Sequence, residues 1–372
     1  MMKATQLKAE GVSVVDFGAG EPDFPTPENI RKAAIQALER SFTKYTPTGG
    51  TRDLKKAVVA RHAKDFGSDY AVEESLITVG GKQAIYEAVA ATIDHGDEVI
   101  LPVPYWVSFL DIINYAGGKA VLLQTSEDEG YAVSAQAVEK LITPKTRLVI
   151  VNSPNNPTGA VTPPEEMERL LALAARHNIR LMSDECYCQL LYDGRKPFSL
   201  GGSKNRDNLI IVGSLSKTYS MTGWRIGFAL GERKLLSNML KLQSHSTSNP
   251  TSFAQAGAVE ALTGPQESVA MMRQEFERRR NSIVAGLRAI PGVQCGLPEG
   301  AFYVYPNVGS FLKKNGVKDT LTLTERLLEE ARVAVVPGEA FGTSEHLRIS
   351  YATSQEQIDE GLRRLKDYFA KH

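Results

Sequence analysis

Residues Ser214-Leu-Ser-Lys-Thr-Tyr-Ser-Met-Thr-Gly-Trp-Arg225 follow the apolar run Leu209–Val212, which is typical of a buried strand. One lysine of this stretch, Lys217, lies among small hydroxyl residues. Poor solvation there favours a neutral amine, and a neutral amine can attack a carbonyl carbon. The serines and Arg225 could bind a phosphate monoester. An amine beside a phosphate site is what pyridoxal 5'-phosphate (PLP) requires, although a surface loop with an ordinary lysine fits this segment equally well.

The composition excludes several classes of protein. The chain has 372 residues, 42% hydrophobic and 23% charged, as in globular proteins with one large domain or two. Basic and acidic residues both number 43, so no net charge points to nucleic acid or to a membrane. No apolar run reaches the roughly 18 residues that span a bilayer. The three cysteines form no ligand cluster and the start lacks a signal-peptide pattern, so we expect no metal and a cytoplasmic protein.

Strands and helices alternate along most of the chain, which predicts an α/β fold with a mostly parallel sheet. Apolar runs predict strands at residues 12–17, 76–79, 98–103, 119–123, 147–152, 179–184 and 209–212. The run Gly227–Leu230 follows too soon for a helical crossover, so we expect an antiparallel strand there. From about Pro291, short strands at 302–305, 333–336 and 347–351 between two helices predict a small α+β domain.

Two strand exits carry candidate binding residues. Gly80-Gly-Lys82 ends one strand and precedes a helix expected from Gln83, so Gly81 and Lys82 would offer free N–H groups and the positive end of the helix dipole to an anion. Many such turns bind nothing. Trp106 follows the strand at 98–103, where open α/β sheets bind ligands, and simple packing is the alternative.

Two further exits carry polar groups. Asn152-Ser-Pro-Asn-Asn-Pro-Thr-Gly159 is a rigid turn whose amides could contact a planar ligand. Asp184 ends a buried strand, where a carboxylate needs a cation or a strong donor such as a protonated pyridine nitrogen. Tyr187 could reach the same ligand. The alternative for Asp184 is the cap of a following helix.

The ends of the chain add two candidates. Gly18-Ala-Gly20 could bring backbone close to a ligand, or it is an ordinary turn. Arg348 projects from an alternating strand and suits bidentate carboxylate binding, with a surface ion pair as the alternative.

Taken in order, these motifs resemble those of the class I/II PLP-dependent aminotransferases of fold type I, and within them the bacterial aspartate aminotransferase subgroup. The resemblance spans nearly the whole chain. It rests on residues 19–24, 44–50, 155–159, 184–187, 214–225 and 347–350, together with Gly-Gly-Lys82 and Pro-Tyr-Trp106.

This resemblance implies a large domain with a seven-stranded mostly parallel sheet between helices and a small α+β domain. The boundaries that we expect are residues 1–35 for an N-terminal segment packing with the small domain, 36–275 for the PLP-binding domain and 276–372 for the small domain.

It also implies a role for each candidate. Lys217 would bind PLP covalently and then act as acid and base, and Asp184 would hold the pyridine nitrogen protonated. The remaining cofactor contacts would come from Tyr187 and Asn156 at the ring oxygen, Trp106 on the ring face, and Gly81, Lys82, Ser214 and Arg225 at the phosphate. Arg348 with Gly20 would bind the substrate α-carboxylate, in a site that also includes Trp106 and Asn156.

The implied reaction moves an amino group between aspartate or glutamate and a 2-oxo acid by a ping-pong mechanism. In the family, Tyr45 reaches the phosphate of the neighbouring subunit, which implies a homodimer. Because no second arginine motif is available, we predict that the Lys82 ammonium also pairs with the distal carboxylate of the substrate. The alternative is a solvated lysine that extends to the surface.

Two departures from the family pattern affect these expectations. The chain begins close to the glycine loop, so we expect reduced packing by an N-terminal arm, and Gly18 replaces a common hydroxyl residue near the substrate. Alternatives are an aminotransferase for prephenate, aromatic or neutral amino acids, a carbon-sulfur β-lyase, or a PLP-binding regulatory module. A regulatory module needs a DNA-binding segment and a basic face, and neither is visible in this sequence.

Overall fold

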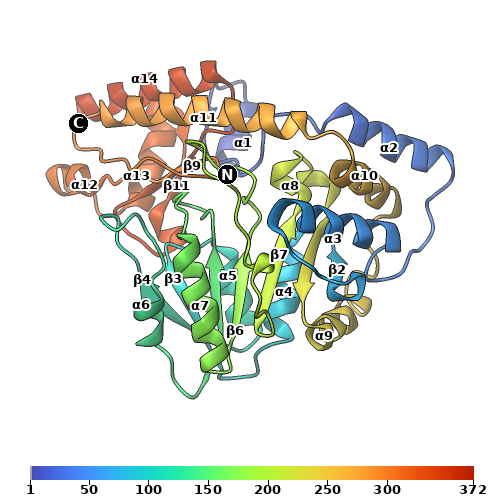
Figure 1. Cartoon of the computed structure of the whole chain (residues 1–372). Coiled ribbons are helices and arrows are strands. Elements are labelled where there is room, and N and C mark those ends of the chain that lie inside the picture. The colour runs from blue at the N-terminus through green and yellow to red at the C-terminus, as the bar shows by residue number, and fades with distance from the viewer. Residues whose placement is uncertain (1) are drawn as a thin grey trace.

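A computed structural model describes residues 2–372 as a large α/β domain capped by a smaller α+β domain (Figure 1). The large domain contains a seven-stranded sheet in the order β2-β8-β7-β6-β5-β3-β4. Its strands are β2 (Ser75–Thr78), β3 (Glu98–Val103), β4 (Lys119–Gln124), β5 (Thr146–Asn152), β6 (Arg180–Asp184), β7 (Leu209–Ser214) and β8 (Gly227–Gly231). Strand β8 runs antiparallel to both of its neighbours, β2 and β7, and the other pairings of the sheet are parallel. The predicted mostly parallel sheet and its antiparallel strand are confirmed.

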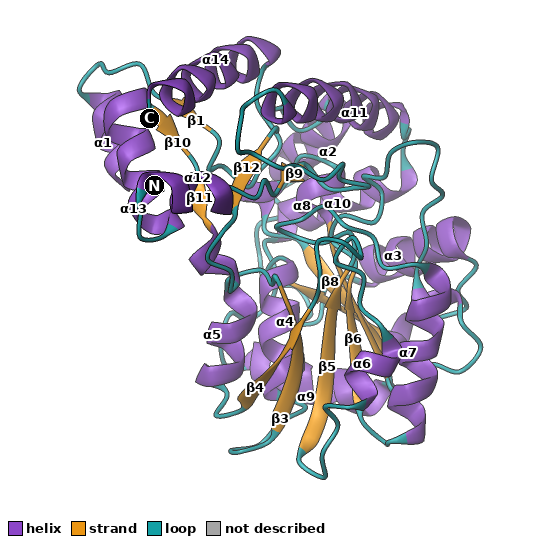
Figure 2. Ribbon diagram, turned by 90° about the vertical axis from the view of Figure 1, so that its left-hand side faces the viewer, coloured by secondary structure: helices purple, strands orange, loops and turns teal. Residues whose placement is uncertain are grey.

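Helices cover both faces of this sheet (Figure 2). On one face lie α4 (Gly81–Ala90), α5 (Ser108–Tyr115) and α9 (Arg233–Ser244). On the other lie α3 (Arg52–Phe66), α6 (Ala135–Glu139), α7 (Pro164–Arg176) and α10 (Ser252–Thr263). Along β7, Ile210 and Val212 pack with the first set, whereas Leu209 and Ile211 pack with the second. The strand is buried on both faces, which explains its uninterrupted apolar sequence.

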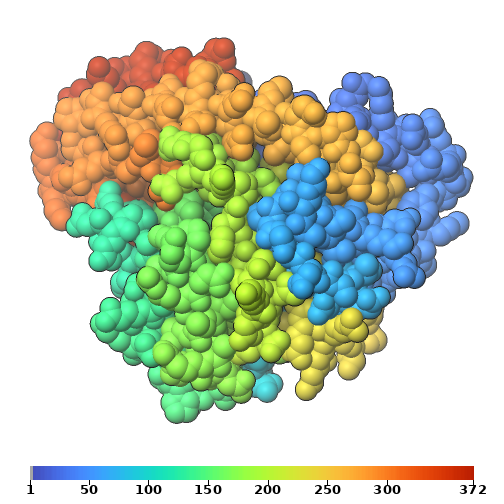
Figure 3. Space-filling model, in the orientation of Figure 1, coloured from blue at the N-terminus to red at the C-terminus, as the bar shows by residue number. Residues whose placement is uncertain are grey.

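The small domain encloses a separate apolar core. Its elements are α1 (Met2–Ala9), β1 (Val15–Asp16), α11 (Glu267–Arg288), β9 (Tyr303–Val304), α12 (Gly309–Asn315), α13 (Thr320–Arg326), β10 (Val333–Ala334), β11 (Val336–Pro337), β12 (Leu347–Ser350) and α14 (Gln355–Lys371). Strands β11, β12 and β9 form an antiparallel sheet, and β1 pairs in parallel with β10. The N-terminal strand therefore joins the C-terminal part of the chain. In Figure 3 the orange and red C-terminal residues lie across one end of the green large domain.

Two further helices pack with the large domain. Helix α2 (Glu28–Glu39) packs on α10, where Asn29 donates to Glu260 at 2.8 Å, and the short α8 (Leu215–Thr218) follows β7 directly. The predicted boundary at residue 275 falls inside the continuous helix α11, and the domain limits stay a prediction.

Several element bounds differ from the sequence expectation. The strand expected at 12–17 is only Val15–Asp16, and the helix expected from Gln83 begins at Gly81. The helix begins early because Gly80, just before it, adopts a φ of 81°, which costs glycine little. This conformation turns the chain sharply after the strand. Within the described residues, no helix combines the length and the apolar character needed to cross a membrane.

Candidate active site

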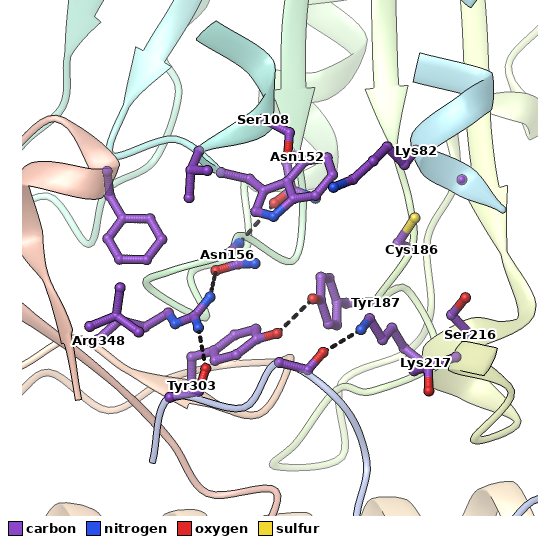
Figure 4. Close-up of a pocket in the computed structure, with 18 of the residues that line it drawn as sticks. Lys82, Ser108, Asn152, Asn156, Cys186, Tyr187, Ser216, Lys217, Tyr303 and Arg348 are labelled. Carbon is purple, nitrogen blue, oxygen red and sulfur yellow. Dashed lines mark hydrogen bonds between the residues drawn. The ribbon is translucent and has the colours of Figure 1, made fainter. Parts of the chain in front are cut away.

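A cavity of about 630 Å³ lies between the two domains, at the carboxyl ends of the central strands (Figure 4). Asn152, Asp184 and Ser214 are the last residues of β5, β6 and β7, and all three line the cavity. Asn152 and Asp184 are directly paired in the register of the sheet. Parallel strands end at one edge, so these three polar residues, dispersed in the sequence, come together there.

Lys217 enters the cavity from α8. The Ser214 side chain caps this helix by accepting the Ser216 N–H at 3.1 Å, which turns the chain sharply after β7. The Lys217 amine donates to the carbonyl of Gly20. Burial lowers its pKa to about 8, although the Cys186 thiol partly offsets this effect. About one amine in ten is then neutral at pH 7, which is the reactive form.

Asp184 is a buried carboxylate, 4% exposed, with no cationic group within 4 Å among residues 2–372. Burial raises its pKa to about 6, and hydrogen bonds from Cys186 partly oppose this. The N–H of Cys186 donates to Asp184 Oδ1 at 3.1 Å. No helix follows Asp184, so the alternative that it caps one is wrong. A carboxylate placed in this way accepts strongly from any positively charged donor that enters the cavity.

Tyr187 and Asn156 stand beside Asp184 in the same wall. The hydroxyl of Tyr187 lies 2.9 Å from that of Tyr303. Asn156 donates its backbone N–H to Asn152 Oδ1 at 2.8 Å, and its side-chain oxygen accepts from Arg348 at 3.1 Å. With its oxygen held by an arginine, the Asn156 side chain turns its NH₂ group toward the cavity.

Donors for an anion gather where α4 begins. The first turn of α4 carries Gly81 and Lys82, whose N–H groups have no partner within the helix. Arg225 crosses this turn, anchored by its bond to the Thr222 carbonyl at 2.9 Å. Gly80, which lies beside this guanidinium, has a φ of 81°, a conformation that residues with a side chain rarely adopt, so this position favours glycine. The side chains of Ser214 and Ser216 complete the group, 2.9 Å from each other.

Arg348 reaches the cavity from β12 of the small domain and is 7% exposed. Its Nη2 donates to the Gly18 carbonyl at 2.9 Å, and its guanidinium lies over the Tyr303 ring at 4.7 Å. Its Nε has no hydrogen-bond partner, and no carboxylate of residues 2–372 lies within 4 Å of it. The surface ion pair considered from the sequence is therefore wrong. A buried, unpaired guanidinium is a site for a carboxylate ligand.

Lys82 and Trp106 form the outer wall. The Lys82 ammonium lies 5.0 Å from the centre of the Trp106 ring, and both side chains line the cavity. Gly20 also lines the cavity, close to the Tyr303 hydroxyl. Tyr45 is different, because it is 91% exposed and does not line the cavity of its own chain.

A family model described as aminotransferase class I and II matches residues 12–365, most of the chain. The chain belongs to the class I and II aminotransferases. It is 42% identical to an aspartate aminotransferase of Bacillus subtilis, over the whole chain and 95% of the relative. It is 41% identical to a probable aspartate/prephenate aminotransferase of Aquifex aeolicus, over 98% of the chain and 93% of the relative.

Solved structures agree with this family assignment. An aspartate aminotransferase of Rhizobium meliloti superimposes with a TM-score of 0.95 at 40% identity, covering 99% of this chain and 94% of that one. The aspartate aminotransferase of Thermus thermophilus with maleate gives 0.93 at 42% identity, with 98% and 94% covered. The predicted family, fold and transaminase class are thus confirmed for this aminotransferase.

Sequence reasoning did not single out several residues that line the site of this aminotransferase, among them Cys186, Ser216 and Tyr303. Cys186 and Ser216 adjoin predicted residues at the ends of the central strands, so a consistent search of every strand exit would have found them. Tyr303 had no such signal, because it comes from a short strand of the other domain.

Proposed function

We propose that this aminotransferase moves the amino group of aspartate or glutamate to a 2-oxo acid, oxaloacetate or 2-oxoglutarate, by a ping-pong mechanism with PLP. One observation carries this proposal, the charge of the cavity. Its lining contains four cationic side chains, those of Lys82, Lys217, Arg225 and Arg348, but only two acids, those of Asp16 and Asp184. Such a cavity suits a phosphate and a substrate with two carboxylates.

One of the two acids is already neutralised, which sharpens the contrast. Asp16 accepts from Lys8 at 2.9 Å and from the Gly18 N–H at 3.0 Å. The names of the relatives also favour a dicarboxylic substrate, since several are aspartate aminotransferases and the Thermus structure contains maleate, a four-carbon dicarboxylate.

The residues present fit PLP. The first turn of α4, Ser214 and Arg225 supply N–H, hydroxyl and guanidinium donors of the kind that bind phosphate. Asp184 would hold the pyridine nitrogen in its protonated form, which removes the cost of an unpaired buried carboxylate. When bound, PLP supplies an aldehyde that receives the amino group and a ring that withdraws electrons from the reacting carbon.

Three more side chains would orient that ring. Tyr187 and the free NH₂ of Asn156 would donate to its phenolic oxygen, and Trp106 would pack on its face. The phosphate donors and Asp184 are fixed by the backbone at strand ends and a helix start. We infer that they hold the cofactor in one orientation relative to Lys217.

Lys217 would do the proton chemistry. Its depressed pKa keeps some amine neutral, so that it can bond to the cofactor aldehyde. Once the substrate amine displaces it, the released amine would take the proton from the substrate α-carbon and deliver it to the acceptor carbon.

Two cations would select the substrate. Arg348, with the Gly20 backbone beside it, would bind the α-carboxylate that every amino acid carries. Lys82 is exposed at the outer wall, and its ammonium would pair with the second carboxylate of aspartate or glutamate.

We also propose that the enzyme is a homodimer in which Tyr45 of the partner subunit reaches the phosphate donors. The proposal rests on the exposure of Tyr45, 91%, and on its absence from the cavity of its own chain. Sedimentation of the holoenzyme is expected to give twice the chain mass. Full activity in a monomer would contradict this.

A second substrate class, prephenate or aromatic amino acids, is favoured by the apolar part of the cavity. Ile85, Val335 and Phe341 contribute to its lining, and the Aquifex relative is named for both aspartate and prephenate. Prephenate carries two carboxylates beside an apolar ring, so it suits the same cations.

One panel separates these possibilities. PLP-loaded enzyme is mixed with aspartate, glutamate, phenylalanine, alanine or cystathionine, and loss of the absorbance band of the bound cofactor is followed over time. Aspartate and glutamate are expected to react fastest. A preference for phenylalanine would identify an aromatic aminotransferase, pyruvate release from cystathionine a β-lyase, and no cofactor uptake would overturn the function.

A further inference from the structure

Tyr303 lies on β9 of the small domain, and its hydroxyl reaches the centre of the active-site cavity. The side chain is 1% exposed, and its hydroxyl oxygen is 2.9 Å from that of Tyr187. Figure 4 shows the two hydroxyl groups pointing toward each other, between Arg348 on one side and Lys217 on the other. This bond connects a residue of the small domain to the proposed cofactor wall of the large domain.

The Tyr303 ring is held from several sides. The Arg348 guanidinium covers its face at 4.7 Å, and the ring of Tyr187 meets it at 5.8 Å with an interplanar angle of 78°. On a further side, a Cβ added to Gly20 would lie 3.3 Å from the Tyr303 hydroxyl. Packing of this kind leaves the hydroxyl little freedom to turn to another partner.

The number of protons decides the direction of the bond. A phenol has one proton to donate and two lone pairs to accept with. Burial raises the pKa of both tyrosines, and the Arg348 guanidinium partly offsets this for Tyr303. Both hydroxyls are therefore protonated at neutral pH, and only one of them donates across the 2.9 Å contact.

The proposed function assigns the single proton of Tyr187 to the ring oxygen of PLP. The proton between the two hydroxyls must then come from Tyr303. In the opposite direction, the described residues would offer the Tyr303 proton no acceptor, since residues 2–372 give its hydroxyl no hydrogen-bond partner other than Tyr187.

We propose that Tyr303 is a positioning residue that donates its proton to Tyr187 and thereby directs the Tyr187 proton at the ring oxygen of the cofactor. This inference rests on the proposed function. Hydrogen bonds in a chain polarise one another, so a donor behind Tyr187 makes Tyr187 the stronger donor. A stronger donor stabilises the deprotonated ring oxygen and lowers the pH at which the bound cofactor titrates.

Tyr303→Phe tests this proposal, because it removes the hydroxyl and keeps the ring beneath Arg348. The absorbance of the PLP-loaded enzyme is measured against pH, and the midpoint is expected to rise by about 0.3–0.7 pH units, the share that a chained donor adds to a charge-assisted bond. The matched control is Tyr305→Phe, two residues along the chain, whose hydroxyl contacts Thr343 at 2.6 Å. Its midpoint is expected to stay at the wild-type value.

Two further measurements fix the mechanism. In a Tyr187→Phe background, Tyr303→Phe is expected to add no further shift, because the donor it polarises is gone. Replacing Tyr303 alone by 3-fluorotyrosine, of similar size but with a more acidic hydroxyl, is expected to lower the midpoint. This replacement also serves if Tyr303→Phe does not fold.

The outcomes separate the two levels of the proposal. A wild-type enzyme that takes up no PLP overturns the proposed function and this inference together. If the wild-type enzyme binds PLP and its absorbance titrates, three results would overturn the inference about Tyr303 alone. These are an unchanged midpoint in Tyr303→Phe, an equal shift by Tyr303→Phe in the Tyr187→Phe background, or a higher midpoint with 3-fluorotyrosine at position 303.

Discussion

The floor and the rim of the active-site cavity are built differently. Asp184 and Lys217 of the floor are buried, and burial favours their neutral forms. It raises the pKa of Asp184 to about 6 and lowers the pKa of Lys217 to about 8. Lys82 and Arg225 of the rim are exposed, and so is Tyr45, which we propose reaches the rim of the neighbouring subunit. Floor residues are thus buried before any ligand arrives, whereas rim residues would be buried only by a bound substrate or by the proposed partner subunit. Substitutions in the floor should therefore abolish the reaction, and substitutions in the rim should reduce it only in part.

The largest effect is expected from Lys217→Ala on the floor. Turnover should fall by at least about 10³-fold, because the acid-base group and the covalent bond to the cofactor are both lost. Lys217→Arg should be equally inactive, since a guanidinium stays protonated and is no nucleophile. Stopped-flow and steady-state assays measure both variants. Near-normal turnover in either one would place the reactive amine elsewhere.

Arg348→Leu should come next. Losing two charge-assisted hydrogen bonds to the α-carboxylate is expected to lower kcat/KM by about 10²–10⁴-fold. Because every amino acid carries this carboxylate, aspartate and alanine should be affected to the same degree. A loss confined to dicarboxylic substrates would reverse the roles proposed for Arg348 and Lys82.

Lys82→Ser tests the rim. It should lower kcat/KM for aspartate by about 10–1000-fold, the loss of one charge-assisted pair, and should change activity toward alanine or phenylalanine much less. Backbone donation by residue 82 to the phosphate survives this change. Equal losses for charged and neutral substrates would show that Lys82 serves the phosphate or the fold.

Tyr45→Phe should have a smaller effect. Loss of one hydrogen bond to a phosphate in the neighbouring subunit is expected to weaken PLP binding by about 10-fold. Titration of the apoenzyme with PLP measures the dissociation constant, and Tyr115→Phe, another strongly exposed tyrosine, is the control. An unchanged dissociation constant for Tyr45→Phe would remove Tyr45 from the site.

The smallest effect concerns Glu87, a buried acid of α4 that does not line the cavity. Burial raises its pKa from 4.5 to about 7, and its Oε2 has no partner. Between these pH values the folded chain keeps a proton that the unfolded chain has released, so stability falls as pH rises. Glu87→Gln should therefore stabilise the protein by about 1–2 kcal/mol more at pH 8 than at pH 5.

Denaturant unfolding at the two pH values measures this difference. The control is Glu325→Gln on the exposed face of α13, for which no such difference is expected. A pH-independent effect of Glu87→Gln would mean that this carboxylate is ionised in the folded chain throughout, as an exposed acid would be.

Much of the floor could be predicted from the sequence, because it follows from local rules. Asp184 and Ser214 end apolar runs, and Asn156 and Lys217 follow such runs within a few residues. In a parallel sheet these positions meet at one edge, so the sequence order alone brings them together. The same rules predicted the antiparallel strand β8 from the short connection before Gly227.

Contacts across the sheet and between domains could not be predicted in that way. No pattern near Tyr303 indicates that its hydroxyl meets Tyr187, 116 positions earlier in the chain. Likewise, the sequence suggested a bidentate arginine at Arg348 but left open an ion pair on the surface. Its burial beside Gly18 and Asn156 depends on how the small domain closes over the large one.

The sequence by itself determined the order of strands and helices, the family and the chemical types at the strand exits, because these depend on periodicity and on residues close in the chain. The tertiary structure alone decided which groups are buried together. Displaced pKa values, an unpaired Arg348 and the contact between the hydroxyls of Tyr187 and Tyr303 all arise from packing together, away from water, groups distant in sequence. Desolvation is a property of the packed molecule, and no short stretch of residues encodes it.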